Sequence, residues 1–174
     1  MGGVARILVV AMVACTGVLL PLVAAADPPA REAFAKLKAL RGEWQGTSNK
    51  GKKVHLSYEP IAGGTAILET FREEGSGLAM STVYHLDGEH LMLTHYCVSN
   101  NQPRMRALLP APEPSTLQFE LFDITNQKDP NDGHMQRAAL HILDDTHLTN
   151  AWTFFEKGKE SFTETGTYER VKAK

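Results

Sequence analysis

Residues 83–93, with the sequence VYHLDGEHLML, decide the fold class of this chain. Two stretches rich in apolar residues flank the pair Asp87-Gly88. A two-residue hairpin turn of type I′ needs a positive φ at both central positions, and Asp-Gly is one of the preferred pairs there. The segment therefore predicts a β-hairpin, two antiparallel strands that meet at Asp87-Gly88.

The same alternation of short strands and turn residues continues on both sides of this hairpin. From residue 42 onward we expect ten strands, separated by segments rich in Gly, Asn, Asp and Pro. Their expected ranges are 42–49, 53–59, 65–73, 79–86, 90–98, 103–109, 116–123, 134–143, 147–155 and 162–171. Every connection is short, so consecutive strands should pair antiparallel as a meander. Closing the meander into a barrel removes its two edges. The predicted fold class is all-β, an antiparallel meander β-barrel of about ten strands with one short N-terminal helix.

The residues before the barrel divide into two segments. Residues 1–26 contain one basic residue, Arg6, an apolar run over 7–23 and three alanines that end at Ala26. This pattern is typical of a secretory signal peptide that is cleaved after Ala26, and lipidation of Cys15 is the alternative. In residues 27–41 apolar side chains recur at helical spacing and predict a short amphipathic helix. The barrel domain then covers residues 42–174.

These features predict a secreted protein, periplasmic or extracellular, without stable membrane insertion after the signal peptide is removed. The formal net charge is −2 at pH 7 and no basic run occurs, so nucleic acid is not an expected partner. Of the two cysteines, only Cys97 remains after cleavage. The mature chain then has no internal disulfide, and its stability must come from packing.

Three residues in the first and last expected strands of the barrel carry a family resemblance. Gly42 and Trp44 form a G-x-W motif in the first expected strand, directly after the helix, and Arg170 lies in the last strand. This combination resembles the calycin superfamily, the β-barrels that include lipocalins, fatty-acid-binding proteins and nitrobindins. The resemblance implies that Trp44 closes the barrel floor and that Arg170 lies across its ring, a cation–π contact worth roughly 0.5–2 kcal/mol.

A closer resemblance rests on the stretches GGTAILETF, YHLDGEHLMLTHYC and NQPRMR. They are similar to uncharacterised secreted bacterial barrels of the DUF1579-like kind. This resemblance covers nearly the whole mature chain and implies a fold and a compartment, with no activity attached.

One expected strand places chemically distinctive side chains on a single face. In residues 90–98 the period of two puts Leu91, Leu93, His95 and Cys97 on the same side. Both faces of this strand are substantially apolar, so the alternation leaves open which of them lines the lumen. If this face is internal, His95 and Cys97 lie near the mouth of a cavity. Otherwise they are ordinary packing residues.

Further polar and aromatic residues are candidates for the same cavity. Glu69 lies in mid-strand among apolar residues, so it either points to solvent or meets a partner inside the barrel. Arg104, close to Asn101 at a strand end, either lies on the outer face or receives a carboxylate or phosphate at the mouth. Tyr84 and Trp152 are expected in the wall, where the hydroxyl and the indole N–H could anchor a ligand.

These residues support three functional hypotheses. The first is reversible binding of a small amphipathic or apolar molecule in the lumen, with its polar end oriented by Glu69, His95, Asn101 and Arg104. The second is an enzyme that uses the same cluster for acid–base chemistry. The third is a barrel without a cavity that serves as an interaction module of the cell envelope.

We expect no cofactor. Glu69, His95 and Cys97 are residue types that bind zinc, but no pair of cysteines or histidines at a typical ligand spacing supports such a site. Haem is bound by nitrobindins, but their extended glycine motif is interrupted here by residues 47–49, Thr-Ser-Asn. A Cys97–His95 nucleophile pair is also disfavoured, because two positions on one strand are about 7 Å apart.

Overall fold

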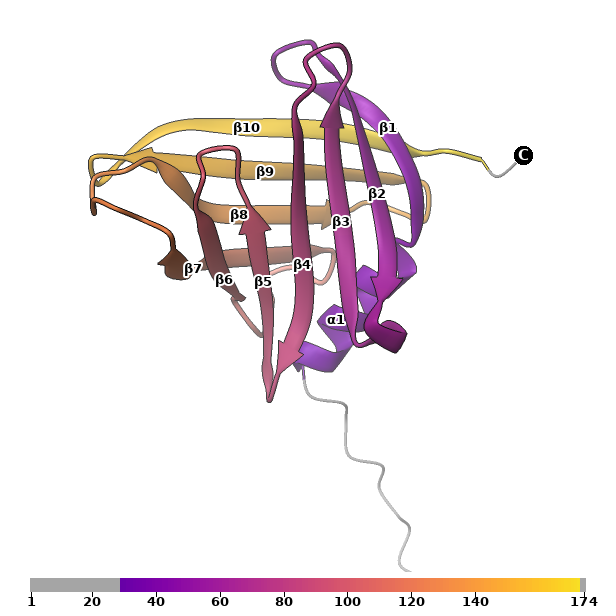
Figure 1. Ribbon diagram of the computed structural model, residues 1–174. Coiled ribbons are helices and arrows are strands. Elements are labelled where there is room, and N and C mark those ends of the chain that lie inside the picture. Colours follow the sequence, from indigo (N-terminus) through magenta and orange to yellow (C-terminus); the bar gives the residue numbers. More distant parts are fainter. Residues whose placement is uncertain (1–28, 173–174) are drawn as a thin grey trace, which may run out of the picture.

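The turn residues divide the chain into the strands that the sequence predicts. The computed structural model describes residues 29–172, and Figure 1 shows their arrangement. The elements, in chain order, are α1 (Pro29–Ala39), β1 (Gly42–Ser48), β2 (Lys53–Ile61), the 3-10 turn η1 (Ala62–Gly64), β3 (Ala66–Glu73), β4 (Ala79–Asp87), β5 (His90–Tyr96), β6 (Gln102–Ala107), β7 (Thr116–Thr125), β8 (His134–Ile142), β9 (His147–Glu156) and β10 (Lys159–Arg170). The predicted fold class is confirmed. The predicted signal peptide lies outside the described residues.

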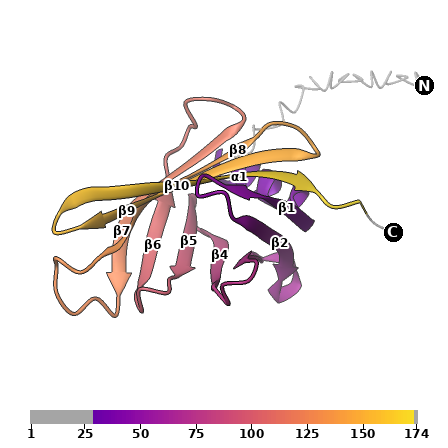
Figure 2. The same ribbon diagram turned by 90° about the horizontal axis from the view of Figure 1, so that it is seen from above.

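The strands form a closed meander. Each strand pairs antiparallel with the next one in the chain, and β1 pairs antiparallel with β10, which closes the barrel. In Figure 1, β2 to β5 lie roughly upright with alternating direction whereas β8 to β10 lie across the view, and Figure 2 shows the same strands from above. No strand of the barrel is left with an unpaired edge, as the short connections predict.

The hairpin between β4 and β5 differs from the prediction by one residue. Asp87 pairs with His90 as the last rung of the ladder, so the two-residue loop is Gly88-Glu89 and not Asp87-Gly88. Gly88 has a φ of +59°, and it alone of the two loop residues has a positive φ. A positive φ at the first loop position only is typical of a type II′ turn, in which glycine occupies that position.

The last strand begins earlier than expected. We predicted its start at residue 162, but β10 begins at Lys159, which pairs with Glu156 of β9. The loop between them consists of Lys157 and Gly158, with φ values of +53° and +70°. Positive φ at both loop positions is typical of the type I′ turn, whose twist matches that of the flanking strands. The hairpin can therefore stay paired up to its tip.

One end of the barrel is closed by α1 together with Trp44 and Arg170. The Trp44 side chain is fully buried, and its indole N–H donates a hydrogen bond to the Leu40 carbonyl oxygen at 2.9 Å. The guanidinium carbon of Arg170 lies 4.2 Å from the centre of the Trp44 ring. The same guanidinium donates hydrogen bonds to the carbonyl oxygens of residues 39, 40 and 41, at 3.0, 3.4 and 2.6 Å. A cation therefore meets the last carbonyls of the helix, where the helix dipole is negative.

Gly42 permits this arrangement. Its φ of +126° lies in a region of backbone conformation that L-residues with a side chain rarely adopt. A Cβ at this position would lie 3.3 Å from a terminal nitrogen of Arg170. The G-x-W motif thus supplies both the turn from helix to strand and the ring beneath the guanidinium.

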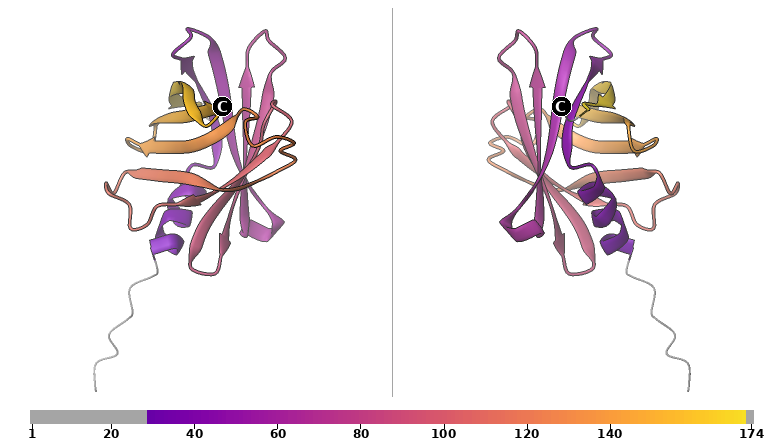
Figure 3. Two further views of the ribbon diagram at one scale, coloured as in Figure 1. Left: turned by 90° about the vertical axis from the view of Figure 1, so that its left-hand side faces the viewer. Right: turned by 90° about the vertical axis from the view of Figure 1, so that its right-hand side faces the viewer.

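The closed floor defines the opposite end as the mouth. Since α1 leads directly into β1, the connections β1–β2, β3–β4, β5–β6, β7–β8 and β9–β10 all lie at the end away from the helix. Figure 3 shows α1 at the opposite end of the barrel from the β1–β2 and β3–β4 loops. Within residues 29–172, no helix has the length and apolar character needed to cross a membrane.

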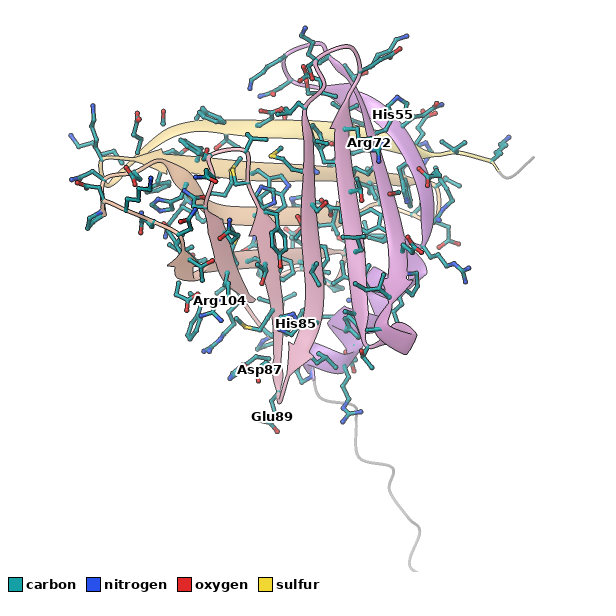
Figure 4. The ribbon with its side chains drawn as sticks, viewed as in Figure 1. His55, Arg72, His85, Asp87, Glu89 and Arg104 are labelled. Carbon is teal, nitrogen blue, oxygen red and sulfur yellow. The ribbon has the colours of Figure 1, made fainter. Side chains whose placement is uncertain are left out.

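The floor generates a prediction about stability. Arg170→Ala removes four hydrogen bonds from a charged donor, one of them to the Asp145 carbonyl oxygen, and one cation–π contact, so the free energy of unfolding should fall by about 2–3 kcal/mol. Arg170→Lys keeps the charge but loses the planar fork, and it should recover less than half of that loss. Urea denaturation followed by circular dichroism measures both variants. Arg72, exposed on β3 (Figure 4), provides the control Arg72→Ala, which should stay close to wild type. An unchanged midpoint for Arg170→Ala would contradict this account of the floor.

Candidate functional site

A row of polar side chains crosses the inner face of four neighbouring strands. Tyr58 on β2 pairs with Glu69 on β3, Glu69 pairs with Thr82 on β4, and Thr82 pairs with His95 on β5. The four residues are only 2%, 4%, 1% and 3% exposed, in that order. Each is part of an alternating pattern whose other inward members are apolar, so the register alone assembles the row. We call these four residues the polar row.

Some polar atoms of this row have partners and others do not. The Tyr84 hydroxyl donates to Oε2 of Glu69 at 2.8 Å, and Nδ1 of His95 is 3.0 Å from the Thr82 hydroxyl. The Tyr58 hydroxyl lies beside the Glu69 carboxylate but meets no acceptor in good hydrogen-bond geometry, and Nε2 of His95 is unpaired. Both atoms are buried, and neither has a partner among the described residues. Buried polar groups left in this way are uncommon and costly, by about 1–3 kcal/mol each.

A second set of polar groups faces this row from the other side of the lumen. Ser48 on β1, Gly166 on β10 and Asn150 on β9 are aligned by the strand register. The Tyr168 ring lies over Gly166, where a Cβ would be only 2.4 Å from the tyrosine hydroxyl. A Cβ on Gly46 would lie 2.8 Å from the same ring. These two glycines therefore give Tyr168 the space to lie along the wall.

A small cavity lies between the two sets, toward the mouth of the barrel. The space that the centre of a water molecule can occupy there is about 40 Å³. Its lining combines polar groups with large apolar side chains: Ser48, Glu69, Phe71, Met80, His95, Met135, Asn150, Trp152, Glu164, Thr165 and Tyr168. The cavity can hold a few water molecules or the polar end of a ligand. A drug-sized ligand needs a pocket of roughly 300–1,000 Å³.

Glu69 is buried without a cation beside it. No lysine or arginine belongs to the described residues that line the cavity. Burial therefore raises the pKa of Glu69, and the hydrogen bond from Tyr84 only partly opposes this effect. Burial and then the neighbouring carboxylate raise the pKa values of Tyr58 and Tyr84 well above the usual value, so both hydroxyls stay protonated.

His95 is held in the neutral form. Burial lowers the pKa of its imidazole to about 4, because nothing nearby compensates a positive charge. The ring is packed against Trp152, with 4.5 Å between the ring centres and 34° between the planes. At neutral pH His95 is thus uncharged, it lines the cavity, and its buried Nε2 has no hydrogen-bond partner among the described residues.

The residues predicted as ligand contacts separate into two groups. Glu69, Tyr84, His95 and Trp152 come together at or beside the cavity. Cys97, Asn101 and Arg104 do not belong to its lining.

Each of these three residues has another environment. Arg104 is exposed on β6 (Figure 4) and forms a bidentate ion pair with Asp123 on β7, which leaves its guanidinium occupied. The Asn101 side chain donates to the Gly133 carbonyl oxygen at 2.9 Å and thereby ties the β5–β6 loop to the start of β8. Cys97 follows the last residue of β5 and is partly buried.

Several residues of the site were not predicted from the sequence. Among them, Ser48, Asn150 and Tyr168 lie on the wall opposite the polar row. Gly46 and Gly166 were a usable signal for Tyr168, since a glycine inside a strand often marks a close approach of another group. The serine and the asparagine carry no such local signal, because only the register of β1, β9 and β10 brings them together.

Two observations on the described residues bear on zinc and haem. In the described part of the chain, no three His, Cys, Asp or Glu side chains are grouped so that they could hold a metal ion. A haem is larger than a drug-sized ligand and does not fit a space of about 40 Å³ without displacement of the wall.

Comparisons with known proteins address the fold. No family model and no curated protein matches the chain. A structure of a DUF3598-family protein of unknown function from Nostoc punctiforme is similar, with 12% identity and a TM-score of 0.53 over 78% of this chain and 49% of that one. Rv2717c from M. tuberculosis is similar with 12% identity and a TM-score of 0.56 over 80% of this chain and 98% of that one.

These likenesses support the antiparallel β-barrel fold and carry no functional information at 12% identity. The alignment spans about half the length of the Nostoc protein. The resemblance to DUF1579-like proteins receives no support from the comparisons.

The lowered pKa of His95 generates a prediction about stability against pH. An unfolded chain binds a proton on this imidazole near pH 6.5, whereas the folded chain does so only near pH 4. Burial of the neutral ring therefore contributes fully to the free energy of unfolding above pH 6.5, and this contribution is lost as the pH falls toward 4. Between pH 7 and 4.5, wild type should lose about 2 kcal/mol more unfolding free energy than His95→Gln.

Urea denaturation at both pH values measures this difference. His90, exposed at the start of β5, gives the matched control His90→Gln, which should follow wild type. Equal pH dependence in wild type and His95→Gln would mean that the imidazole is not buried as described.

Proposed function

We propose that this barrel binds a small molecule in its lumen, with the polar end of the ligand against the polar row and its apolar part toward the mouth. The observation that carries this proposal is the buried Nε2 of His95, which has no hydrogen-bond partner among the described residues. His95 lines the cavity. A ligand that bonds to it would satisfy a group whose isolation otherwise destabilises the fold.

The wall of the cavity toward the mouth suits the apolar part of such a ligand. Phe71, Met80, Met135 and Trp152 line the cavity, and three of them are partly exposed. Methionine is flexible and polarisable, so Met80 and Met135 can adapt to ligands of different shape. The small space inside favours a ligand with only a few atoms beyond its polar group in the lumen, and a longer tail would extend between these side chains.

The two other hypotheses have less support. General acid–base catalysis works best with a pKa near the working pH, and His95, with a pKa of about 4, is far from neutrality, so the enzyme hypothesis rests on Glu69 alone. A fully packed interaction module has no need for an unpaired buried imidazole beside a space of about 40 Å³.

The proposal includes export of the protein to the periplasm or the medium. The apolar run over 7–23 and the alanines before Asp27 support it. Fractionation of the host followed by N-terminal sequencing should find the mature protein outside the cytoplasm with Asp27 as its first residue. Recovery in the cytoplasm with an intact N-terminus would contradict export and leave the binding proposal untouched.

Ligand binding is tested by NMR with a mixture of fragments of up to about eight non-hydrogen atoms, containing alcohols, amides, amines and carboxylic acids. Binding fragments should shift the backbone amide signals of the polar row and of Asn150. His95→Leu replaces the polar ring by an apolar side chain and should weaken the best fragment at least tenfold, which corresponds to the loss of one hydrogen bond of about 1.4 kcal/mol or more.

The control is His55→Leu, since His55 is exposed on the outer face of β2 (Figure 4). This variant should bind as wild type does. Shifts confined to the outer surface, or equal effects of both variants, would contradict binding in the lumen.

A further inference from the structure

We propose that the lumen prefers small organic cations, primary amines above all, and that their ammonium group pairs with the carboxylate of Glu69. This inference rests on the proposed function and names the class of ligand. The Glu69 side chain is buried, lines the cavity and takes part in no ion pair within the described residues. An ionised carboxylate in such a place lacks a counter-charge, and a ligand that brings one would supply it.

The atoms around the cavity match the needs of an ammonium group. A primary ammonium has three N–H donors and no acceptor, as lysine has. The cavity offers the Glu69 carboxylate, the side-chain oxygens of Ser48 and Asn150, and Nε2 of His95 when its ring proton lies on Nδ1. In that tautomer the Nδ1–H donates to the Thr82 hydroxyl, which lies 3.0 Å away.

The register supports a site between Glu69 and His95. Thr82 stands between them on the middle strand of the three, and adjacent strands are about 4.8 Å apart. The backbones of Glu69 and His95 are therefore separated by roughly 10 Å. Glu69 and His95 both line the cavity, so a single polar group in it can lie between their side chains.

The surrounding wall favours the same charge. Phe71, Trp152 and Tyr168 contribute aromatic rings, and desolvated cations bind to the faces of such rings. Glu164 at the rim adds a second carboxylate, which is paired with Lys50 at 2.7 Å. A ligand carboxylate would instead meet Glu69 without any basic residue among the described residues of the lining. Simple fatty acids are thus the wrong charge for this lumen.

Three probes of nearly equal size separate the possibilities: n-propylammonium chloride, propan-1-ol and sodium propionate, each titrated into the purified protein at pH 8 and followed by NMR. We expect n-propylammonium to bind at least tenfold more tightly than propan-1-ol, and propionate to leave the lumen signals unchanged. Glu69→Gln keeps the size of the side chain and removes its charge. It should weaken n-propylammonium at least tenfold and abolish the preference for n-propylammonium over propan-1-ol.

Glu89→Gln is the matched control, because Glu89 is exposed in the β4–β5 turn (Figure 4) and the same chemical change there should leave binding as in wild type. A second measurement needs no variant. Binding of n-propylammonium requires ionised Glu69, whose pKa is raised by burial. In a titration between pH 5 and 8 its affinity should increase with pH wherever Glu69 is still partly protonated, and that of propan-1-ol should stay constant.

The other titratable groups that face Glu69 are distinguishable from it. The pKa values of the neighbouring tyrosines are raised and that of His95 is lowered to about 4, so none of them changes charge in this range. Glu164 lies at the rim with its partner Lys50. Loss of the pH dependence in Glu69→Gln therefore assigns it to Glu69.

The outcomes that overturn the inference are specific. Propan-1-ol or propionate binding as tightly as n-propylammonium would overturn it and leave the proposed function in place. An affinity for n-propylammonium that is the same in wild type and in Glu69→Gln would also overturn the inference. If no fragment of any class shifts the lumen signals, the proposed function itself fails.

Discussion

The contact of Arg170 with Trp44 and with the end of α1 is the interaction on which the rest of the structure depends. It joins the first strand, the last strand and the helix at one point, and Trp44 and Arg170 are direct partners in the β1–β10 ladder. A shift of this pairing by one residue would turn every inward side chain of one strand outward. The floor contact therefore fixes the register that aligns Ser48 with Gly166 and Asn150 at the other end.

With the register fixed, the interior separates into two layers of different character. Near the floor the inward residues are apolar, with Leu37, Trp44, Leu56 and Leu91 almost inaccessible to solvent. Farther along the strands, Glu69, Thr82 and His95 of the polar row interrupt this apolar interior. Burying such groups without full hydrogen bonding destabilises a barrel, so an interior built only for packing would place apolar residues there. The stability of the floor and the polar groups of the lumen together favour a binding role.

Much of the fold followed from the sequence. The period of two and the turn residues predicted ten strands, and the G-x-W motif with Arg170 predicted how the barrel is closed. The errors were local: the β4–β5 loop is shifted by one residue, since Gly88 rather than Asp87 takes the positive φ, and β10 begins earlier because a tight turn extends the hairpin.

The site was less predictable than the fold. Glu69 and His95 stood out as polar residues on apolar strand faces, and the structure buries both. Asn150, by contrast, lies more than fifty positions from its neighbours of the polar row, and only long-range pairing shows that it faces them. Arg104 had a plausible position at a strand end, but an acidic partner across the ladder, Asp123, holds it outside. A sequence without register information cannot distinguish these cases.

The central claim is that Glu69 is a buried carboxylic acid without a protein cation beside it. The most direct test is a pH titration of its side-chain carboxyl carbon by ¹³C NMR. The account predicts a pKa above the ordinary value of 4.5, because burial disfavours the charged form. A value at or below 4.5 would contradict it, since the carboxylate would then have to be exposed to water or stabilised by a positive charge.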